Sequence, residues 1–485
     1  INESEHFIMA EGLTGPGDFI IEELKLVTTT GLEVDLSTMV MGITIFENIF
    51  SMTISGTVAI MDSVNLASYG PLLGQEYLHL KIATPTFIEE SAVIDFSKNV
   101  FLVHSISKRQ EISPSGVQGF VLSFVSQELV KNQRIKVTQS LTDSWSNIVE
   151  RMLVDYLGTK KNRVIEESSG VKKFVAPNIR PLDIIVLGMK QAVALYKGEP
   201  TYLFYENLKG FNFRTLASLY NEPSLIEYTT SVAGTNLTKD GMVDVLRDLG
   251  TIINYQIVSN NDSLINYRTG MYASKLITHD ILNKSYRTET YNYHDNFNNE
   301  SHIVGGVTEG KLEFPLASEL HIQEDGSRVS DFPARTFLMP TSLTGSVDSQ
   351  HVTSNNTSPY MAYDPHKWIQ RRTSQMIQLE NALNINILVH GNTLINAGDK
   401  VTVNLPYKAA VKGVDNDSFD KFYKGPFIIK RLRHDFDTSS SPAKHTMHMN
   451  LVKDSLEEKL DAPTDNFEPS ADSVAVAESY KYYNT

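Results

Sequence analysis

Alternation of apolar and polar residues, the pattern that most narrowly limits the fold, marks both ends of this 485-residue chain. Between residues 76 and 82, Leu78, Leu80 and Ile82 fall on one side of the chain, which is the period of a strand with one buried face. Turn-forming residues separate several such runs, an order typical of a barrel or a sandwich. The other runs in the first third are 19–27, 43–49, 51–61, 100–106 and 119–125.

The middle of the chain changes to a helical period. Apolar residues recur three and four positions apart between residues 145 and 156, so they form one face of a helix. We expect Ser140 and Asp143 at its N-terminal cap and Gly158 at its end. Pro181 is suited to the first turn of a second helix.

Beyond residue 260 the chain is rich in Asn, Ser, Thr and Tyr as far as about residue 360, and we expect an irregular insertion there. A helix is predicted to begin at Pro365, with Arg371 and Arg372 facing outward. Alternation then returns, and residues 427–436 and 444–452 predict a hairpin.

The last 33 residues carry eight acids and three bases, so we expect a tail that orders on a partner. We therefore predict an α+β, β-rich chain in which two β-domains, each a barrel or a sandwich, flank an α/β middle domain. The expected units are an N-terminal arm (1–16), a first β-domain (17–127), the middle domain with its insertion (128–240 with 264–372), a second β-domain (241–263 with 373–452) and an acidic tail (453–485).

Composition excludes several classes of chemistry. The chain has no cysteine, which rules out disulfides, a cysteine nucleophile and cysteine-bound zinc or iron–sulfur clusters. Its net charge of −14 opposes binding of DNA phosphates by the chain as a whole. No apolar stretch reaches the length needed to cross a bilayer. The acidic first residues are unlike the basic start of a signal peptide.

Motifs for phosphate or calcium are incomplete. Residues 305–311 have the spacing of a phosphate-binding loop, but Leu312 stands where a hydroxyl group must reach magnesium. We interpret this stretch as a loop before a strand. Asp415, Asp417 and Asp420 fail the spacing of a calcium-binding loop and are interpreted as part of a solvated hairpin loop.

Histidine and glutamate patterns are equally weak as signals of a site. His434, His445 and His448 suggest a metal set, but residues three apart on a strand face opposite sides. Adjacent glutamate pairs also diverge and are read as solvated charge, although carboxylates distant in sequence can still meet in space, as glycosidases require. We therefore predict no catalytic, cofactor-binding or metal-binding residues.

Specific strings nevertheless resemble one family, the hub proteins of contractile injection machines, which are phage baseplate hubs and the base of type VI secretion spikes. The strings are 204–213 (FYENLKGFNF), 396–401 (NAGDKV) and 425–429 (GPFII), and the run from 56 to 78 fits the first hub barrel. The likeness extends in order over residues 17–452. The residues that carry it are Glu206, Gly210, Phe213, Gly398, Gly425 and Pro426.

The resemblance implies a structural protein rather than an enzyme, without cofactors. It implies a homotrimeric ring in which two similar tail-tube-like barrels per subunit give quasi-sixfold symmetry. Such a ring joins the sixfold tail tube to a trimeric spike, and phage DNA passes through its lumen without specific binding. The implied partners are the spike, a tail tube or tube-initiator protein and baseplate wedge proteins. The implied location is the tail baseplate of a virion assembled in the host cytoplasm, with residues 453–485 contacting the spike or a neighbour.

Two other functions stay open from the residues. A tail-associated cell-wall hydrolase predicts a cleft in which carboxylates converge. A host-glycan-binding adhesin predicts exposed aromatic platforms, and Tyr286, Tyr291 and Tyr293 are its support.

Overall fold

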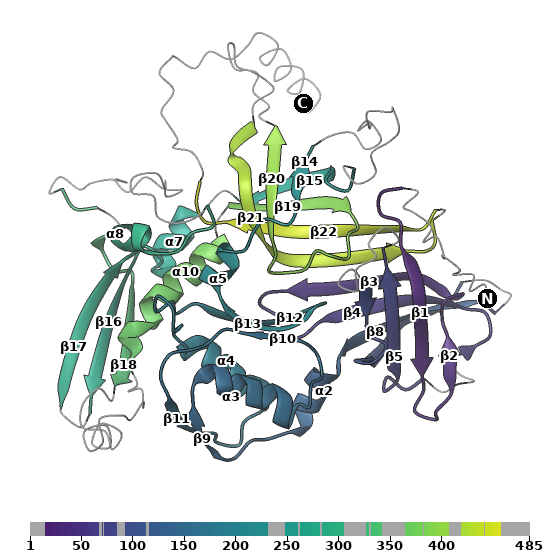
Figure 1. Cartoon of the computed structure of the whole chain (residues 1–485), viewed down its shortest axis with the longest axis horizontal. Helices are drawn as coiled ribbons and strands as arrows, with labels where there is room; N and C mark the ends of the chain where they lie inside the picture. Colours follow the sequence, from purple (N-terminus) through teal and green to yellow (C-terminus); the bar gives the residue numbers. More distant parts are fainter. Residues whose placement is uncertain are drawn as a thin grey trace, which may run out of the picture.

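The computed structural model describes residues 15–66, 70, 72–84, 93–112, 116–230, 248–259, 262–281, 284–304, 326–328, 331–341, 364–381, 383–406, 419–440 and 442–456. Strands dominate these ranges, which confirms the β-rich fold (Figure 1). In the same ranges no helix combines the length and hydrophobicity that crossing a membrane demands. Some predicted features lie outside them, namely residues 305–311, Asp415, Asp417 and the tail from 457 onward.

Two groups of strands form the main sheet. The first comprises β1 (Ile20–Val27), β2 (Glu33–Asp35), β3 (Val40–Asn48), β4 (Ser55–Asp62), β5 (Tyr77–Ala83), β6 (Val93–Asp95), β7 (Phe101–Glu111) and β8 (Gln118–Ser126). The second comprises β14 (Glu227–Thr229), β15 (Ile252–Ser259), β19 (Leu383–His390), β20 (Lys400–Pro406), β21 (Phe419–Asp437) and β22 (Lys444–Lys453).

One long strand, β21, joins the two groups. Its 19 residues pair with β20 at the beginning and with β22 at the end, and residues 431–437 also pair with β3. The result is a single sheet with the order β15-β19-β22-β21-β3-β4-β8-β7-β5-β1-β2. Among the described strands this sheet does not close into barrels. The expected separate barrels are therefore replaced by two halves of one sheet, because β21 bonds to both.

Each half encloses its own apolar core, and the alternation read from the sequence decides which side chains enter it. Leu78, Leu80 and Ile82 are all fully buried in the first core, as their period predicts. In the second half, the alternating residues Met447, Met449 and Leu451 are buried in the second core, together with residues of β19 and β20. Fully burying one such side chain contributes about 1.5–3 kcal/mol, so these alternating runs stabilise the two halves substantially.

A smaller α/β layer packs beside the first half (Figure 1). It contains α2 (Gln127–Arg134), β9 (Ser140–Asp143), α3 (Trp145–Arg151) with a π-helical turn (Met152–Tyr156), β10 (Arg163–Ile165), β11 (Lys172–Val175), α4 (Pro181–Gln191), β12 (Tyr202–Asn207), β13 (Gly210–Thr215) and α5 (Leu216–Tyr220). The predicted helix start at Pro181 is confirmed. The cap of the earlier helix was wrong: Ser144 caps it, because Ser140–Asp143 pairs with β11 as a strand.

The region predicted to be irregular contains a three-stranded sheet, so that expectation was wrong. The strands are β16 (Ala273–Asp280), β17 (Ser285–Asn292) and β18 (Arg335–Thr341), with α7 (Ser263–Thr269), α8 (Tyr293–Asn296) and a 3-10 turn (Phe297–Asn299) at one end. Its many Thr and Tyr residues suit strands, which explains the outcome.

The helix expected from Pro365 begins later. Pro365–Lys367 is a 3-10 turn, and α10 spans Ile369–Asn381. Arg372 does not face outward: it is buried, and its Nη1 donates to the carbonyl oxygen of Tyr202 at 2.7 Å. A carbonyl partner inside the molecule therefore decides the orientation of this guanidinium, which helix periodicity alone cannot indicate.

Candidate assembly surfaces

The continuous sheet offers two open edges at opposite ends of an eight-strand run. At one end, β15 pairs with β19, and no described strand pairs along its other side. At the other end, β7 pairs with β8 along its length but with β5 only at Tyr77↔Leu102 and Leu78↔Phe101. The N–H of Val103 donates to the carbonyl oxygen of Glu76 at 2.8 Å. Beyond Val103, no described strand pairs with β7 on this side, and such edges are ready templates for strand addition.

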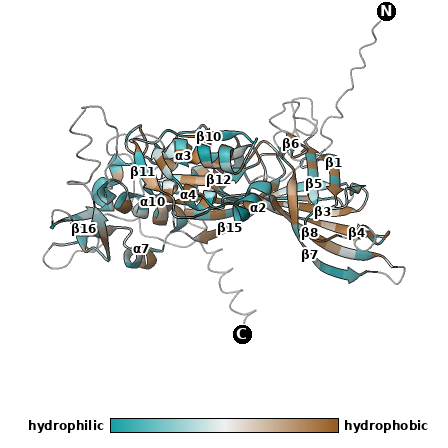
Figure 2. Cartoon of the chain, turned by 90° about the horizontal axis from the view of Figure 1, so that it is seen from below, coloured by the Kyte–Doolittle hydropathy of each residue, from teal (hydrophilic) through white to brown (hydrophobic). Residues whose placement is uncertain are grey.

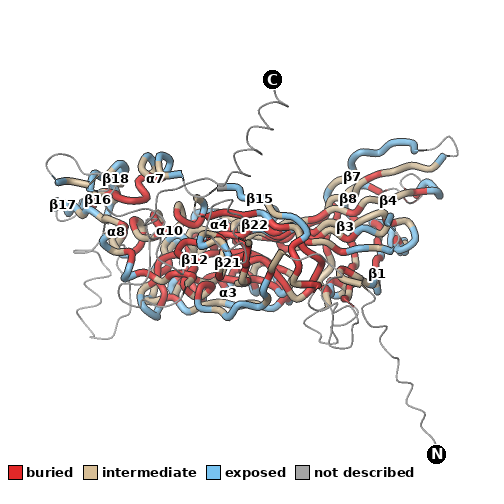
Figure 3. Tube along the Cα trace, turned by 90° about the horizontal axis from the view of Figure 1, so that it is seen from above, coloured by how far each residue is buried: buried red, intermediate tan, exposed pale blue. Residues whose placement is uncertain are grey.

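The two edges differ in chemistry. Strand β15 exposes three large apolar side chains, Ile253, Ile257 and Val258, each nearly half accessible. The outer end of β7 is exposed and polar, and it projects with β8 from the body of the molecule (Figures 2 and 3). Apolar residues on an open edge strand are a liability for a monomer and are typical of an interaction site.

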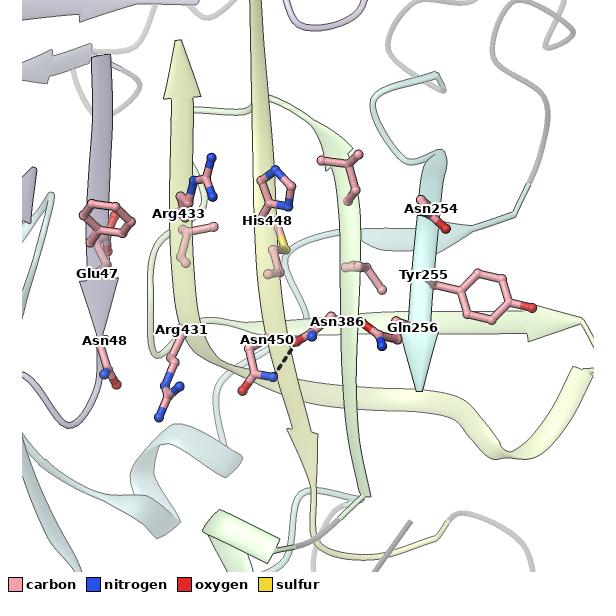
Figure 4. A pocket seen from close by; sticks show the side chains of 15 residues that line it. Glu47, Asn48, Asn254, Tyr255, Gln256, Asn386, Arg431, Arg433, His448 and Asn450 are labelled. Atoms are coloured by element: carbon pink, nitrogen blue, oxygen red, sulfur yellow. Dashed lines mark hydrogen bonds between the residues drawn. The ribbon is translucent and has the colours of Figure 1, made fainter. Parts of the chain in front are cut away.

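Between these edges, the outward face of the sheet is hollowed into a groove of about 480 Å³ (Figure 4). One row of side chains crosses five neighbouring strands on its floor. From β15 to β3, the strand register places in this row Gln256, Asn386, Asn450, Arg431 and Asn48.

The amides in the groove bond to one another. Nδ2 of Asn450 donates to Oδ1 of Asn386 and to Oδ1 of Asn384, both at 2.7 Å. Figure 4 shows the first of these bonds between β22 and β19. Over β15, β19 and β22 this row is therefore uncharged but rich in hydrogen-bonding groups.

Few acids enter the groove, although the chain carries −14. Arg433 Nε donates to Asp435 at 2.9 Å, and Nε2 of His448 lies 3.4 Å from the same carboxylate. Arg431 has no carboxylate within 4.0 Å among the described residues. The negative charge of the chain is thus not concentrated on this face.

On the opposite side of the same strands, three buried polar side chains form a row of hydrogen bonds. His434 lies between Glu47, with Nε2 3.1 Å from Oε1, and His445, with Nδ1 3.1 Å from Nε2. Glu47 also accepts from the backbone N–H of Ala397 at 2.9 Å. Burial, and then the neighbouring His434, hold the pKa of His445 well below its ordinary value. This row of three hydrogen-bonded side chains connects β3 of the first half to β21 and β22 of the second.

The three histidines singled out in the sequence do not gather. His445 is fully buried, whereas about half of the His448 side chain is exposed on the groove face, so the predicted opposite orientation is confirmed. Across the described residues, no three His, Asp or Glu side chains stand close enough together to hold a metal ion.

Glu206, a residue of the family strings, lies at a buried junction of three segments. Its Oε1 accepts from Lys161 Nζ at 2.6 Å, and its Oε2 accepts from Ser126 Oγ at 2.6 Å and from the N–H of Ile54 at 3.0 Å. Lys161 also donates to Glu128 at 2.8 Å. Burial opposes the charge on Lys161, but Glu206 and Glu128 outweigh it and raise the pKa of the ammonium. The cluster ties the first half of the sheet to the α/β layer.

Two glycines of the same strings are sites of close approach. Gly210 has φ +132°, and a Cβ there would lie 2.2 Å from the carbonyl oxygen of Asn162. Gly398 has φ +92°, and a Cβ would lie 2.2 Å from the hydroxyl of Tyr205. Both positions require glycine, since other residues are strained at such φ values and would clash.

The remaining string residues are Phe213, which lies in a core, and Gly425 and Pro426, which lie on a strand. Phe213 on β13 is fully buried in the α/β layer, stacked on Tyr202 with ring centroids 4.5 Å apart. Gly425 and Pro426 lie on β21 opposite Val403 and Thr402 of β20. Together the six residues occupy packing positions in three different parts of the fold, rather than one cleft.

The tyrosines that supported an adhesin do not form one platform. Tyr286 is 78% exposed, whereas Tyr293 is only 1% exposed. The hydroxyl of Tyr291 donates to Glu300 at 3.0 Å. They therefore belong to three different environments.

Arg371 holds two carboxylates that are distant in sequence at one site, and no local pattern indicated this arrangement. Arg371 lies between Glu300, with Nε 2.9 Å from Oε1, and Glu199, with Nη2 3.3 Å from Oε2. Both carboxylates are buried, and burial raises the pKa of Glu199. The arginine that separates them makes this arrangement an internal ion network between the α/β layer and α10.

No protein-family model and no curated protein matches the chain. Among solved structures, it is similar to the tail protein from Neisseria meningitidis MC58, with 9% identity, 90% of this chain and 96% of that chain covered, and a TM-score of 0.48. The 43 kDa tail protein of prophage MuSo2 from Shewanella oneidensis is 9% identical, with 89% of this chain and 98% of that chain covered and a TM-score of 0.48. The prophage tail protein gp18 from Listeria monocytogenes EGD-e is 10% identical, with 96% of this chain and 100% of that chain covered and a TM-score of 0.41.

A further match is the E. coli c3393 protein, described as a component of the type VI secretion system, with 9% identity, 92% of this chain and 79% of that chain covered, and a TM-score of 0.38. These four proteins are thus described as tail proteins or as a type VI secretion component. At such identities the likeness concerns the outline of the fold, so the roles of individual residues rest on the contacts of this chain alone.

Proposed function

We propose that this chain is a structural hub of a contractile phage tail, in which three copies join edge to edge into a ring. The observation that carries the proposal is the eight-strand run with an open edge at each end, β15 and β7. Because the two edges differ, joining them is a head-to-tail contact, and such contacts close into rings when the rotation allows it.

Quasi-sixfold symmetry follows from the strand order. Each half of the sheet supplies four strands to the run, β15, β19, β22 and β21 from one half and β3, β4, β8 and β7 from the other. Three copies thus alternate six four-strand units around the axis. In this proposal the halves, with boundaries near 17–127 and 241–263 with 373–452, act as the two tube-like units of each subunit.

The polar face of the run then lines the channel, and the two apolar cores lie on its outer side. Amides such as Asn386 and Asn450 exchange hydrogen bonds readily with water, so they hydrate the wall and allow DNA to pass without specific binding.

One rim of the ring meets the tail tube or its initiator, and the other meets the trimeric spike, with wedge proteins outside. The family-string residues from Glu206 to Pro426 serve the fold rather than any catalysis, and the protein acts in the tail baseplate of the virion.

A substitution on the apolar edge tests this proposal. Ile257→Lys places a charge on β15, a device that natural edge strands use against pairing. We expect wild-type chains to give ring-shaped particles of three 54.3 kDa subunits in electron micrographs and native mass spectra, and Ile257→Lys to remain monomeric.

The matched control is Leu264→Lys, which changes an exposed apolar residue on α7, outside both edge strands. This variant should still form rings. Rings that persist in Ile257→Lys, or that disappear equally in both variants, would contradict the edge-to-edge arrangement.

A further inference from the structure

A second hollow, of about 210 Å³, opens where the first half of the sheet meets the α/β layer. Three separate segments line it: the turn before β7, helix α2, and the residues that follow the π-helical turn. Each contributes lysine, namely Lys98 from the turn, Lys131 from α2, and Lys160 with Lys161 from the third segment.

Three of these ammonium groups lack an anionic partner. Across the described part of the chain, no carboxylate lies within the 4.0 Å of an ion pair from Lys98, Lys131 or Lys160. Lys161 differs, because it is buried between Glu128 and Glu206. Glu206 is not among the residues that line the hollow, and, although burial raises the pKa of Asp95, Lys98 is among the groups that lower it. The lining therefore carries four lysines and one carboxylate, that of Glu128, within a chain whose net charge is −14.

The other polar groups of the hollow are already engaged. Gln127 Nε2 donates to the carbonyl oxygen of Val100 at 2.9 Å. Glu128 accepts from Thr159 at 2.7 Å as well as from Lys161, so its oxygens are satisfied within the protein. What the hollow offers a ligand is thus lysine side chains from three separate segments of the chain.

We propose that this hollow binds a phosphate group, either free or esterified. Lysine acts as a compact point charge and is a common phosphate ligand. A lining with more lysines than carboxylates favours an anion such as phosphate. A bound phosphate connects the turn at Lys98 with the segment at Lys160, so it bridges the first half of the sheet and the α/β layer. This inference stands independently of the ring.

Calorimetric titration of the full chain with inorganic phosphate at constant ionic strength tests the proposal. We expect saturable binding that weakens at least tenfold in Lys131→Met and in Lys160→Met. The control is Lys190→Met, which removes the same charge from the exposed end of α4. Circular dichroism shows whether each variant is folded, and phosphate should raise the unfolding temperature of wild type and Lys190→Met only.

Two further ligands identify the chemistry. Glycerol 3-phosphate that binds as tightly as inorganic phosphate means that the hollow accepts esters, whereas weaker binding restricts it to the free ion; both results support a phosphate site. Succinate binding more tightly than phosphate overturns the assignment. Absence of saturable phosphate binding, or equal loss in the Lys131, Lys160 and Lys190 variants, also overturns it.

Discussion

Nε2 of His434 lies 3.1 Å from Oε1 of Glu47, and this contact joins the two halves of the sheet beneath the groove. Both side chains are fully buried. Because Glu47 accepts, Nε2 of His434 donates, and its Nδ1 then accepts from Nε2 of His445. The contact therefore fixes one tautomer of two histidines and aligns β3 with β21.

Removing the carboxylate should loosen this junction. Glu47→Ala leaves the N–H of Ala397 and the ring of His434 without their acceptor, and an unsatisfied buried donor costs about 1–3 kcal/mol. We expect urea unfolding to report a loss of about 3 kcal/mol for the two donors together. Glu47→Gln retains one oxygen and should lose less. A Glu47→Ala chain as stable as wild type would mean that the contact contributes nothing to the junction.

Acid should destabilise the fold through buried histidines. Burial, followed by Arg328, lowers the pKa of His294 to about 4, whereas the unfolded chain titrates near 6.5. The unfolded state therefore takes up a proton first as the pH falls. This contribution to stability is complete above about pH 6.5 and declines toward pH 4, by about 2 kcal/mol between pH 7.5 and pH 5.

His294→Phe isolates that effect, because the ring stacked on Tyr272 is retained. Denaturation at pH 7.5 and pH 5 should show a smaller loss in the variant than in wild type. His302 acts in the opposite sense: burial lowers its pKa, but Asp454 outweighs burial and raises it. Its contribution is present below about pH 6.5 and disappears as the pH rises through the raised pKa. An unchanged pH dependence in His294→Phe would refute the assignment.

The buried ion cluster around Lys161 should be sensitive to single substitutions. Lys161→Met leaves Glu128 and Glu206 buried without their counter-ion, and breaking a buried pair costs about 3–5 kcal/mol. Adding Glu128→Gln and Glu206→Gln removes the stranded charges, so the triple variant should regain part of the loss. Equilibrium unfolding compares them. A triple variant that is less stable than Lys161→Met would contradict this account of the cluster.

The glycine at 398 should not tolerate a side chain. Gly398→Ala combines a left-handed φ, which costs about 1–3 kcal/mol, with a clash against the hydroxyl of Tyr205. Tyr205→Phe removes that hydroxyl, so the double variant should recover the part of the loss that comes from the clash. Thermal unfolding of the two single variants and the double variant measures this coupling. Strictly additive losses would show that the clash has no influence.

Local sequence patterns correctly predicted the strands and helix starts that depend only on neighbouring residues. The alternation at Leu78 and Leu80 and the first-turn preference of Pro181 identified a strand and a helix, since periodicity and local backbone geometry decide both. The cap at Ser144 was missed because the segment before it is held by β11, a partner that periodicity does not reveal.

Features that depend on distant pairing could not be predicted. Thr44 and Asp435 are hydrogen-bonded across β3 and β21 although 391 positions separate them. No local signal links these strands, so the sequence suggested two closed barrels where one sheet exists. The ion cluster at Lys161 could not be predicted either, because no local pattern distinguishes this lysine from others. Only the fold brings Glu128 and Glu206 to it. Open edges are a property of the finished sheet, which explains why the two assembly surfaces appear only there.

Cysteine cross-linking between the two edges tests the ring most directly. The chain has no cysteine of its own, so any introduced pair reports without background. A disulfide requires Cα atoms within about 7 Å, which paired edge strands satisfy in one register. Substitutions on β7 at Ser105 or Ser107 are combined with substitutions on β15 at Asn254, Gln256 or Val258.

The account predicts that at least one of these combinations forms covalent trimers on mild oxidation, and that each single-cysteine variant does not. Trimers should separate into monomers again on reduction. If rings form but no combination of the two edges yields a covalent trimer, the copies are joined through other surfaces and the edge-to-edge hub is wrong.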